Sequence, residues 1–213
     1  MKSLRSNFRV IFVSGLFLLG CSLLPIPNTN VNISPTYTPL PAMPPEQPTE
    51  TSMGLENENL LAEVPSGFKI DYQAEQNGVV INEMVPEGES VNDWTTLVTV
   101  QIFMGMTNTA PEQYQENMTQ SWFNACENSE SYPVADGEEN GYNFVLWQLY
   151  CPLNPSTQKV EYAYLKAIQG NDSFYLVQVA FRHEPSSDEI TQWMQYLKQV
   201  QVCDSRIPEQ ACP

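Results

Sequence analysis

Apolar and polar residues alternate along the first part of the folded region, which is the period of a β-strand. The alternation runs from Phe68 to Tyr72, and a second apolar stretch covers 79–85 after the pair Asn77-Gly78. Asn-Gly between two such stretches is a strong signal for a two-residue hairpin turn. Beyond a turn at 86–88, the β-branched and aromatic residues from Thr96 to Met104 predict a third strand, in the centre of a sheet.

A change to a spacing of three and four residues predicts a helix after that strand. Its apolar side carries Tyr114, Met118 and Trp122. Thr109 with Glu112 three residues later has the pattern of a capping box, and Pro111 suits the first turn of a helix. We therefore expect the helix to begin at Thr109.

Three further strands and a closing helix complete the pattern. The strands are predicted at 142–151, 160–169 and 173–182, and the last two are joined by a tight turn, so that the three form a meander. Ser186 and Glu189 form a second capping box. Five apolar residues line one face of the helix that follows: Ile190, Trp193, Met194, Leu197 and Val200.

The predicted order is ββ-β-α-βββ-α, which describes a mostly antiparallel sheet covered by helices, an α+β fold. No Pro-rich break and no internal repeat interrupts residues 62–213, so we expect a single globular domain there. This order resembles the PsbP-like α/β/α sandwich, which is found in photosystem-associated lipoproteins and in a nuclear transport regulator. The resemblance implies a binding or assembly factor, and it brings no site residues with it.

The amino-terminal residues 1–20 have the pattern of a signal peptide. Three basic residues precede an apolar stretch from Val10 to Leu19, which is too short to span a membrane. The sequence Leu-Leu-Gly-Cys that ends at Cys21 resembles the lipobox of bacterial lipoproteins. The resemblance implies cleavage before Cys21 and a diacylglyceryl group on its sulfur, which would anchor the protein to a membrane. The alternative is an ordinary secretory signal with an incidental cysteine.

Residues 21–61 are predicted to form a tether between the lipid and the domain. They contain eight prolines, from Pro25 to Pro48, mixed with Asn, Thr and Ser, and such a composition cannot bury a core. We favour a plain spacer without a binding motif of its own. Ser22 after the cysteine resembles lipoproteins that are sorted to the outer membrane, so we expect an outer-membrane protein whose domain faces the periplasm.

The charge of the chain restricts its partners. Nine Lys and Arg residues against 25 Asp and Glu residues give a formal net charge of −16, and cleavage before Cys21 removes three cations and no acid. Such a chain repels polyanions, which argues against DNA or RNA as a partner. It also repels anionic lipid headgroups, so the membrane contact is expected to come from the lipid on Cys21 alone.

With Cys21 bound to lipid, four cysteines remain, an even number that suits disulfides in an exported protein. Of the three pairings, proximity in the sequence favours Cys126 with Cys151 and Cys203 with Cys212. The alternatives are four free thiols or a metal site, and neither pair has the CxxC spacing of a metal site.

No pattern in the sequence predicts a catalytic or metal site. His183 is the only histidine, and a catalytic triad would need Ser186, which already caps a helix. The acidic run 127–139 lacks the spacing of a calcium loop, so we interpret it as a solvated connection. The sequence has no Gly-rich phosphate loop, and we expect no cofactor.

Three short segments resemble a family of proteobacterial envelope proteins, namely 85–90 with Trp94, 99–101 and 166–170. The resemblance implies no activity. Periodicity buries the tryptophans, but Trp94 follows an acidic turn and is a candidate groove residue. We therefore expect a non-enzymatic envelope protein that binds or assembles another envelope protein through a surface containing Pro86, Glu87 and Trp94. The alternative is a periplasmic binder of glycans or small ligands, or a hydrolase without a recognisable motif.

Overall fold

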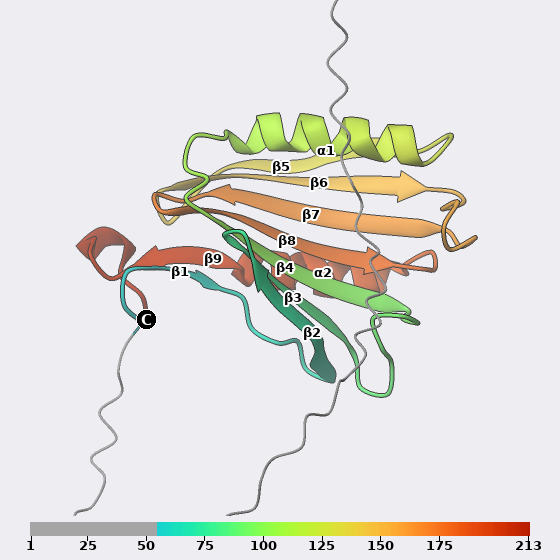
Figure 1. Cartoon of the computed structure of the whole chain (residues 1–213), viewed down its shortest axis with the longest axis horizontal. Helices are drawn as coiled ribbons and strands as arrows, with labels where there is room; N and C mark the ends of the chain where they lie inside the picture. The colour runs from blue at the N-terminus through green and yellow to red at the C-terminus, as the bar shows by residue number, and fades with distance from the viewer. Residues whose placement is uncertain (1–54) are drawn as a thin grey trace, which may run out of the picture. The chain divides into compact units, whose positions relative to one another are not determined.

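A computed structural model describes residues 55–213, in which nine strands, two α-helices and one 3₁₀-helix follow one another (Figure 1). The strands are β1 (Glu58–Leu61), β2 (Phe68–Gln76), β3 (Val79–Pro86), β4 (Thr96–Met104), β5 (Glu130–Glu139), β6 (Tyr142–Cys151), β7 (Glu161–Gln169), β8 (Ser173–Phe181) and β9 (Gln201–Asp204). The helices are α1 (Pro111–Ala125), α2 (Ser187–Gln199) and the 3₁₀-helix η1 (Pro208–Gln210). The predicted signal peptide, Cys21 and the Pro-rich part of the tether lie outside the described residues.

Seven of the strands form one antiparallel sheet in the order β2-β3-β4-β8-β7-β6-β5. The predicted hairpin is confirmed: Asn77 and Gly78 have φ values of 54° and 77° and connect β2 to β3. Positive φ at both central residues is what a type I′ turn requires. The predicted central place of β4 and the meander of β6, β7 and β8 are confirmed as well.

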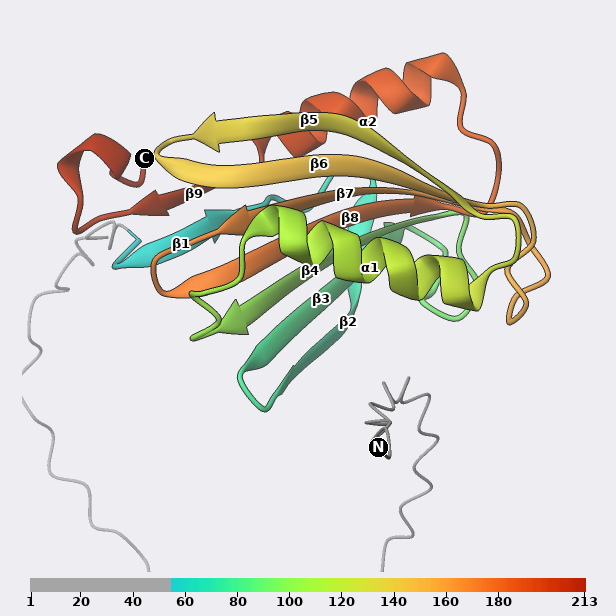
Figure 2. The same ribbon diagram turned by 90° about the horizontal axis from the view of Figure 1, so that it is seen from above.

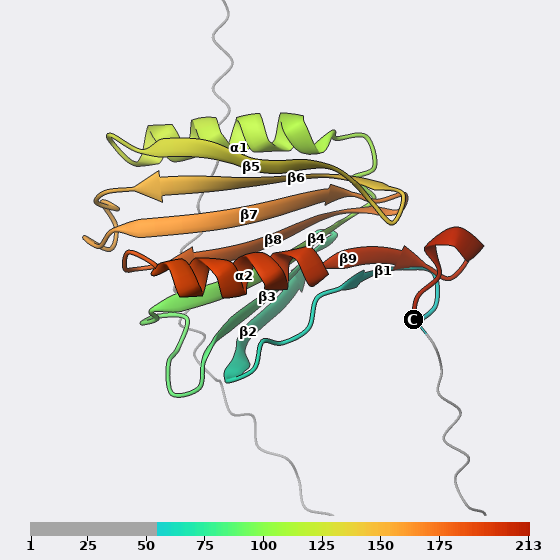
Figure 3. The same cartoon turned by 180° about the vertical axis from the view of Figure 1, so that it is seen from behind.

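The sheet lies between two layers. Helix α1 covers part of one face, and α2 packs on the opposite face together with a two-stranded ribbon of β1 and β9 (Figures 2 and 3). Each face has its own apolar core, with Trp147, Leu165 and Leu176 on the α1 side and Val177, Trp193 and Leu197 on the α2 side. The expected α+β class, a mostly antiparallel sheet covered by helices, is therefore confirmed.

The two helices begin in different ways. The capping box of α2 is confirmed, because the Ser186 hydroxyl accepts a hydrogen bond from the Glu189 amide while the Glu189 side chain accepts one from the Ser186 amide. The capping box predicted for α1 is wrong, because Ala110 occupies the N-cap and no side chain caps the helix. Pro111 sets the start of α1 instead, which leaves Thr109 one residue too early to reach the first turn.

Strand β5 corrects the prediction for the acidic run 127–139. We interpreted this run as a solvated connection, but residues Glu130–Glu139 pair with β6 as an edge strand. Almost all of its side chains are exposed, as the acidic composition indicated. An edge strand needs only backbone hydrogen bonds to one neighbour, so it can form without apolar alternation. Pro133 sits at a bulge, where its missing N–H costs little.

The folded body begins before the predicted boundary at residue 62. Strand β1 pairs antiparallel with β9, with Glu58 opposite Asp204 and Leu60 opposite Val202. Both strands have only four residues, and neither has a pattern that would distinguish it from a loop. Their pairing joins segments from the two ends of the domain, so local sequence patterns did not predict it.

Candidate functional site

One half of the sheet is not covered on its α1 side. Helix α1 packs over β6 and β7, while β2 and β3 project beyond it (Figure 2). The register of the strands places a row of side chains across this half, because directly opposite residues point to the same face. We use the name "open face" for six residues of this region: Tyr72, Ile81, Glu83, Thr99, Gln101 and Gln178.

Glu83 lies at the centre of the open face. It stands between Tyr72 on β2 and Thr99 on β4, and Gln178 continues the row on β8. Tyr72 is 45% exposed, whereas Glu83 is half-buried and Thr99 is buried. Among residues 55–213, the Glu83 carboxylate has no hydrogen-bond or ion-pair partner, and burial raises its pKa above the ordinary value of 4.5. A half-buried carboxylate without a partner costs folding free energy. Groups whose pKa is shifted by burial cluster at functional sites, which makes Glu83 a candidate binding residue.

The three residues of the predicted partner surface, Pro86, Glu87 and Trp94, differ in how far they are exposed. Pro86 is half-buried at the end of β3 and Glu87 is exposed, with its amide bonded to the Gly67 carbonyl at 2.8 Å. Trp94 is only 6% exposed, and the Arg182 guanidinium lies over its ring at 3.8 Å from the centroid. The groove role of Trp94 is therefore wrong, because the ring belongs to the core on the α1 side.

The loop that carries these residues is held by acidic side chains. The Glu89 carboxylate accepts hydrogen bonds from the Thr95 amide and hydroxyl at 2.7 and 2.8 Å. Asp71 accepts one from the Val91 amide at 2.9 Å, and the nearby Lys69 helps to keep the pKa of Asp71 below its usual range. These contacts fix the loop beside one end of the open face.

The residues considered for a catalytic triad do not form one. His183 Nε2 lies 3.0 Å from Glu189 Oε1, and the Ser186 hydroxyl donates to Glu189 Oε2 at 2.8 Å. The carboxylate therefore stands between the histidine and the serine, whereas a nucleophilic serine needs the histidine next to it. These contacts orient the first turn of α2. The hydrogen bonds from the Ser186 amide and hydroxyl, together with the contact to His183, hold the pKa of Glu189 below its usual value.

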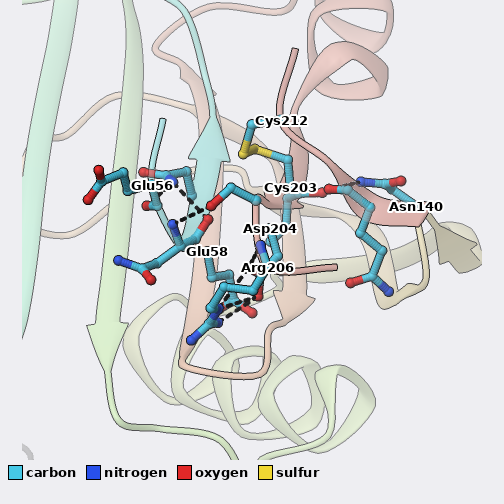
Figure 4. The surroundings of a disulfide bond; sticks show 12 residues. Glu56, Glu58, Asn140, Cys203, Asp204, Arg206 and Cys212 are labelled. Carbon is cyan, nitrogen blue, oxygen red and sulfur yellow. Dashed lines mark hydrogen bonds and ion pairs between the residues drawn. A yellow bond between two sulfur atoms is a disulfide. The ribbon is translucent and has the colours of Figure 1, made fainter. Parts of the chain in front are cut away.

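The four remaining cysteines lie in two pairs. Cys126 is bonded to Cys151, which joins the end of α1 to the end of β6, with Cα atoms 5.9 Å apart. Cys203 is bonded to Cys212, which closes a loop after β9, with Cα atoms 4.9 Å apart (Figure 4). This is the pairing predicted from the sequence. Peptide mapping under non-reducing conditions should recover these two linked pairs.

Lys166 is a site that sequence reasoning missed. It lies on β7, is 1% exposed, and donates hydrogen bonds to the carbonyls of Leu197 and Val200 at 3.0 and 2.8 Å. Glu139 is its ion-pair partner at 2.5 Å. Burial lowers the pKa of Lys166, and the Glu139 carboxylate opposes this effect. A lysine within the apolar stretch of β7 was the signal in the sequence, since lysine is almost never fully buried unless it is paired.

Within residues 55–213, no group of His, Cys, Asp and Glu side chains is arranged to hold a metal ion. No helix in this part of the chain has the length and hydropathy needed to cross a membrane.

Several solved structures are similar to this chain. A mutant of the protein Mog1 is 12% identical, and the match covers 66% of this chain and 84% of Mog1 with a TM-score of 0.38. The Ran-binding protein Mog1p from Saccharomyces cerevisiae is 11% identical over 67% of this chain and 85% of its own, also with a TM-score of 0.38.

The solution structure of cyanobacterial PsbP (CyanoP) from Synechocystis sp. PCC 6803 matches 71% of this chain and 95% of its own chain. Its identity is 9% and its TM-score is 0.38. At these values the similarities carry no argument about what this chain binds. Among curated proteins, no sequence matches the chain.

One protein-family model matches residues 66–204. The matched segment begins just before β2 and ends with β9, so it contains the whole seven-stranded sheet, both α-helices and the open face. Because the match spans more than half of the chain, this protein belongs to the family that the model describes.

Proposed function

We propose that this protein is a non-enzymatic, lipid-anchored protein of the cell envelope that binds a protein partner through the open face. Cys21 carries the lipid in this proposal, the tether spaces the domain from the outer membrane, and the domain faces the periplasm. The lipobox-like sequence around Cys21 and the even number of remaining cysteines support this location.

The observation that carries the binding function is the unpartnered carboxylate of Glu83. It stands in a row of polar side chains on the part of the α1-side face that α1 leaves uncovered, where a cation from a partner would satisfy it. Tyr72 at the rim is an aromatic residue with an exposed ring, a type that is enriched at protein interfaces. The net charge of −16 would steer a partner with a basic surface toward the domain.

Replacing Glu83 by Gln should stabilise the free protein by about 1 kcal/mol at pH 7, because the half-buried charge is removed while the shape is kept. Burial raises the pKa of Glu83, so the folded state binds this proton more tightly than the unfolded chain does. Wild-type stability therefore falls as the pH rises from the ordinary value through the raised pKa. The advantage of Glu83→Gln should be present above this window and absent at lower pH. Urea unfolding from pH 4 to pH 8 measures it, and an equal difference at every pH would contradict the assignment.

Affinity purification from crosslinked membranes tests the partner. Wild-type protein should enrich one envelope protein, and Glu83→Lys should reduce its recovery at least tenfold because the new cation repels a basic partner surface. Glu75→Lys is the matched control, because Glu75 is exposed on the same hairpin but points to the opposite face. Cys21→Ser tests the anchor, and it should lower recovery without affecting folding.

Three other outcomes of this purification would contradict parts of the proposal. Equal recovery with Glu83→Lys and wild type would exclude the open face as the binding surface. Equal recovery with Cys21→Ser would exclude a role of the lipid. Recovery of glycan or lipid in place of a protein would favour the alternative of a periplasmic ligand binder.

A further inference from the structure

The turn between β7 and β8 binds a carboxylate from the other end of the domain. The Glu58 side chain accepts hydrogen bonds from three successive backbone amides, those of Asn171, Asp172 and Ser173, at 2.5, 3.0 and 3.2 Å. The Tyr175 hydroxyl donates a fourth hydrogen bond at 2.9 Å. Successive N–H groups that converge on one anion form the arrangement known as a nest.

Gly170 makes room for this carboxylate. A Cβ atom at position 170 would collide with Glu58 Oε1, and it would lie 2.7 Å from both the Ser173 carbonyl oxygen and the Tyr175 ring. Gly170 also closes the turn, because its amide donates to the Ser173 carbonyl at 2.9 Å. The site is therefore shaped for its ligand, since a larger residue at this position would fill it.

The ligand of the nest belongs to β1, which β9 holds from the other side. Glu58 lies opposite Asp204 in the ribbon of β1 and β9, next to the disulfide of Cys203 (Figure 4). Arg206 joins Asp204 to Asp172 of the turn at 2.6 Å from each, which offsets the negative charge around the nest. β1 has four residues and pairs with β9, and the four hydrogen bonds to Glu58 attach it directly to the β7–β8 turn of the large sheet.

We propose that the β7–β8 turn is a carboxylate-binding site and that Glu58 is its intramolecular ligand. In this arrangement β1 is a strap: the Glu58 carboxylate fixes it to the body of the domain, and an empty nest releases it from β9 while the seven-stranded sheet stays folded. The site accepts a carboxylate as a chemical class, because its donors contact only the two oxygens of Glu58. This inference does not depend on the open face, which lies on the opposite side of the sheet.

Chemical rescue tests the site in the purified full-length protein. Glu58→Ala should lower the Tm by about 5 °C, and sodium acetate should restore at least half of this loss in a saturable way at constant ionic strength. Acetate should not raise the Tm of the wild type, whose nest is filled. Glu56→Ala is the matched control: this acid is exposed and two residues earlier, and its variant should keep the wild-type Tm and show no rescue.

The double variant Glu58→Ala with Gly170→Ala closes the nest, so acetate should have no effect on it. Rescue that persists in the double variant, or that is as large with chloride as with acetate, would overturn the carboxylate site. Absence of any acetate effect on Glu58→Ala would overturn it as well.

Hydrogen exchange in the Glu58→Gln variant tests the strap. Glutamine keeps the shape of the side chain, so this test remains possible if Glu58→Ala fails to fold. In Glu58→Gln the amides of 58–61, 171–173 and 201–204 should exchange at least tenfold faster, while those of β4 and β8 stay protected. Faster exchange throughout the domain would show that Glu58 supports the whole fold, and would overturn the strap. Unchanged exchange at 58–61 would do the same.

Discussion

Lys166→Ala should destabilise the domain by about 4 kcal/mol, the largest effect of any single substitution considered for this protein. The ammonium group is 1% exposed, and it holds the carbonyls of Leu197 and Val200 at the end of α2 together with the Glu139 carboxylate. The last carbonyls of a helix have no hydrogen-bond donor within the helix. Removing the Lys166 ammonium would leave these buried carbonyls without a donor, which is costly. Urea unfolding followed by circular dichroism measures the change.

The Lys166→Met variant separates the contribution of the lysine side chain's packing from the contribution of its charge. Methionine keeps the apolar contacts of the lysine stem, so it should recover about half of the loss seen with alanine. Lys198→Ala is the matched control, because Lys198 is an exposed lysine in the last turn of α2, and its removal should change stability by no more than about 0.5 kcal/mol. A loss below about 1 kcal/mol for Lys166→Ala would contradict the role of the ammonium as the cap of α2.

Removal of the Cys126–Cys151 disulfide should cost about 3.5 kcal/mol, mainly because the unfolded chain gains freedom when a loop with a sequence separation of 25 is opened. The bond joins the end of α1 to β6, where the Trp122 indole N–H also donates to the Tyr150 carbonyl at 3.2 Å. The double variant Cys126→Ser with Cys151→Ser measures this in chemical denaturation without reductant. α1 should become the first element to exchange its amides.

The Cys203–Cys212 disulfide provides the comparison. Its sequence separation is only 9, so the same chain-entropy estimate gives about 2.7 kcal/mol for its removal. A reducing agent should destabilise the wild type by about as much as both double variants together, and should have no effect on a chain without the four cysteines. Alkylation of Cys126 and Cys151 in unreduced, denatured wild-type protein would contradict the pairing.

Much of the seven-stranded sheet could be predicted because its strands have a strong local pattern. Asn77-Gly78 fixed the β2–β3 hairpin, since the pair favours the positive φ values that its turn needs. β6, β7 and β8 are apolar stretches bounded by turns, which is the pattern that predicts strands, and β7 and β8 are buried on both faces. β5 was missed because an exposed edge strand needs no apolar side chains.

The candidate site was predicted less well than the fold. The candidate partner surface was predicted at Pro86, Glu87 and Trp94, but the Trp94 ring is buried under Arg182. Glu83 was not recognised, because an acid in a largely apolar strand has the same sequence pattern whether its face meets water or a partner. Only the position of α1, over β6 and β7 but not over β3, makes Glu83 part of an open face.

The sequence was sufficient for those features that depend on residues a few positions apart: the hairpin turn, the capping box of α2, the strand periods and the overall α+β class. The tertiary structure was needed for contacts between distant residues. Lys166 meets carbonyls 31 and 34 residues away, and Glu58 meets a turn 113 to 115 residues away. Local patterns reflect backbone preferences and neighbouring side chains, whereas these contacts depend on how helices, strands and turns pack after the chain has closed long loops.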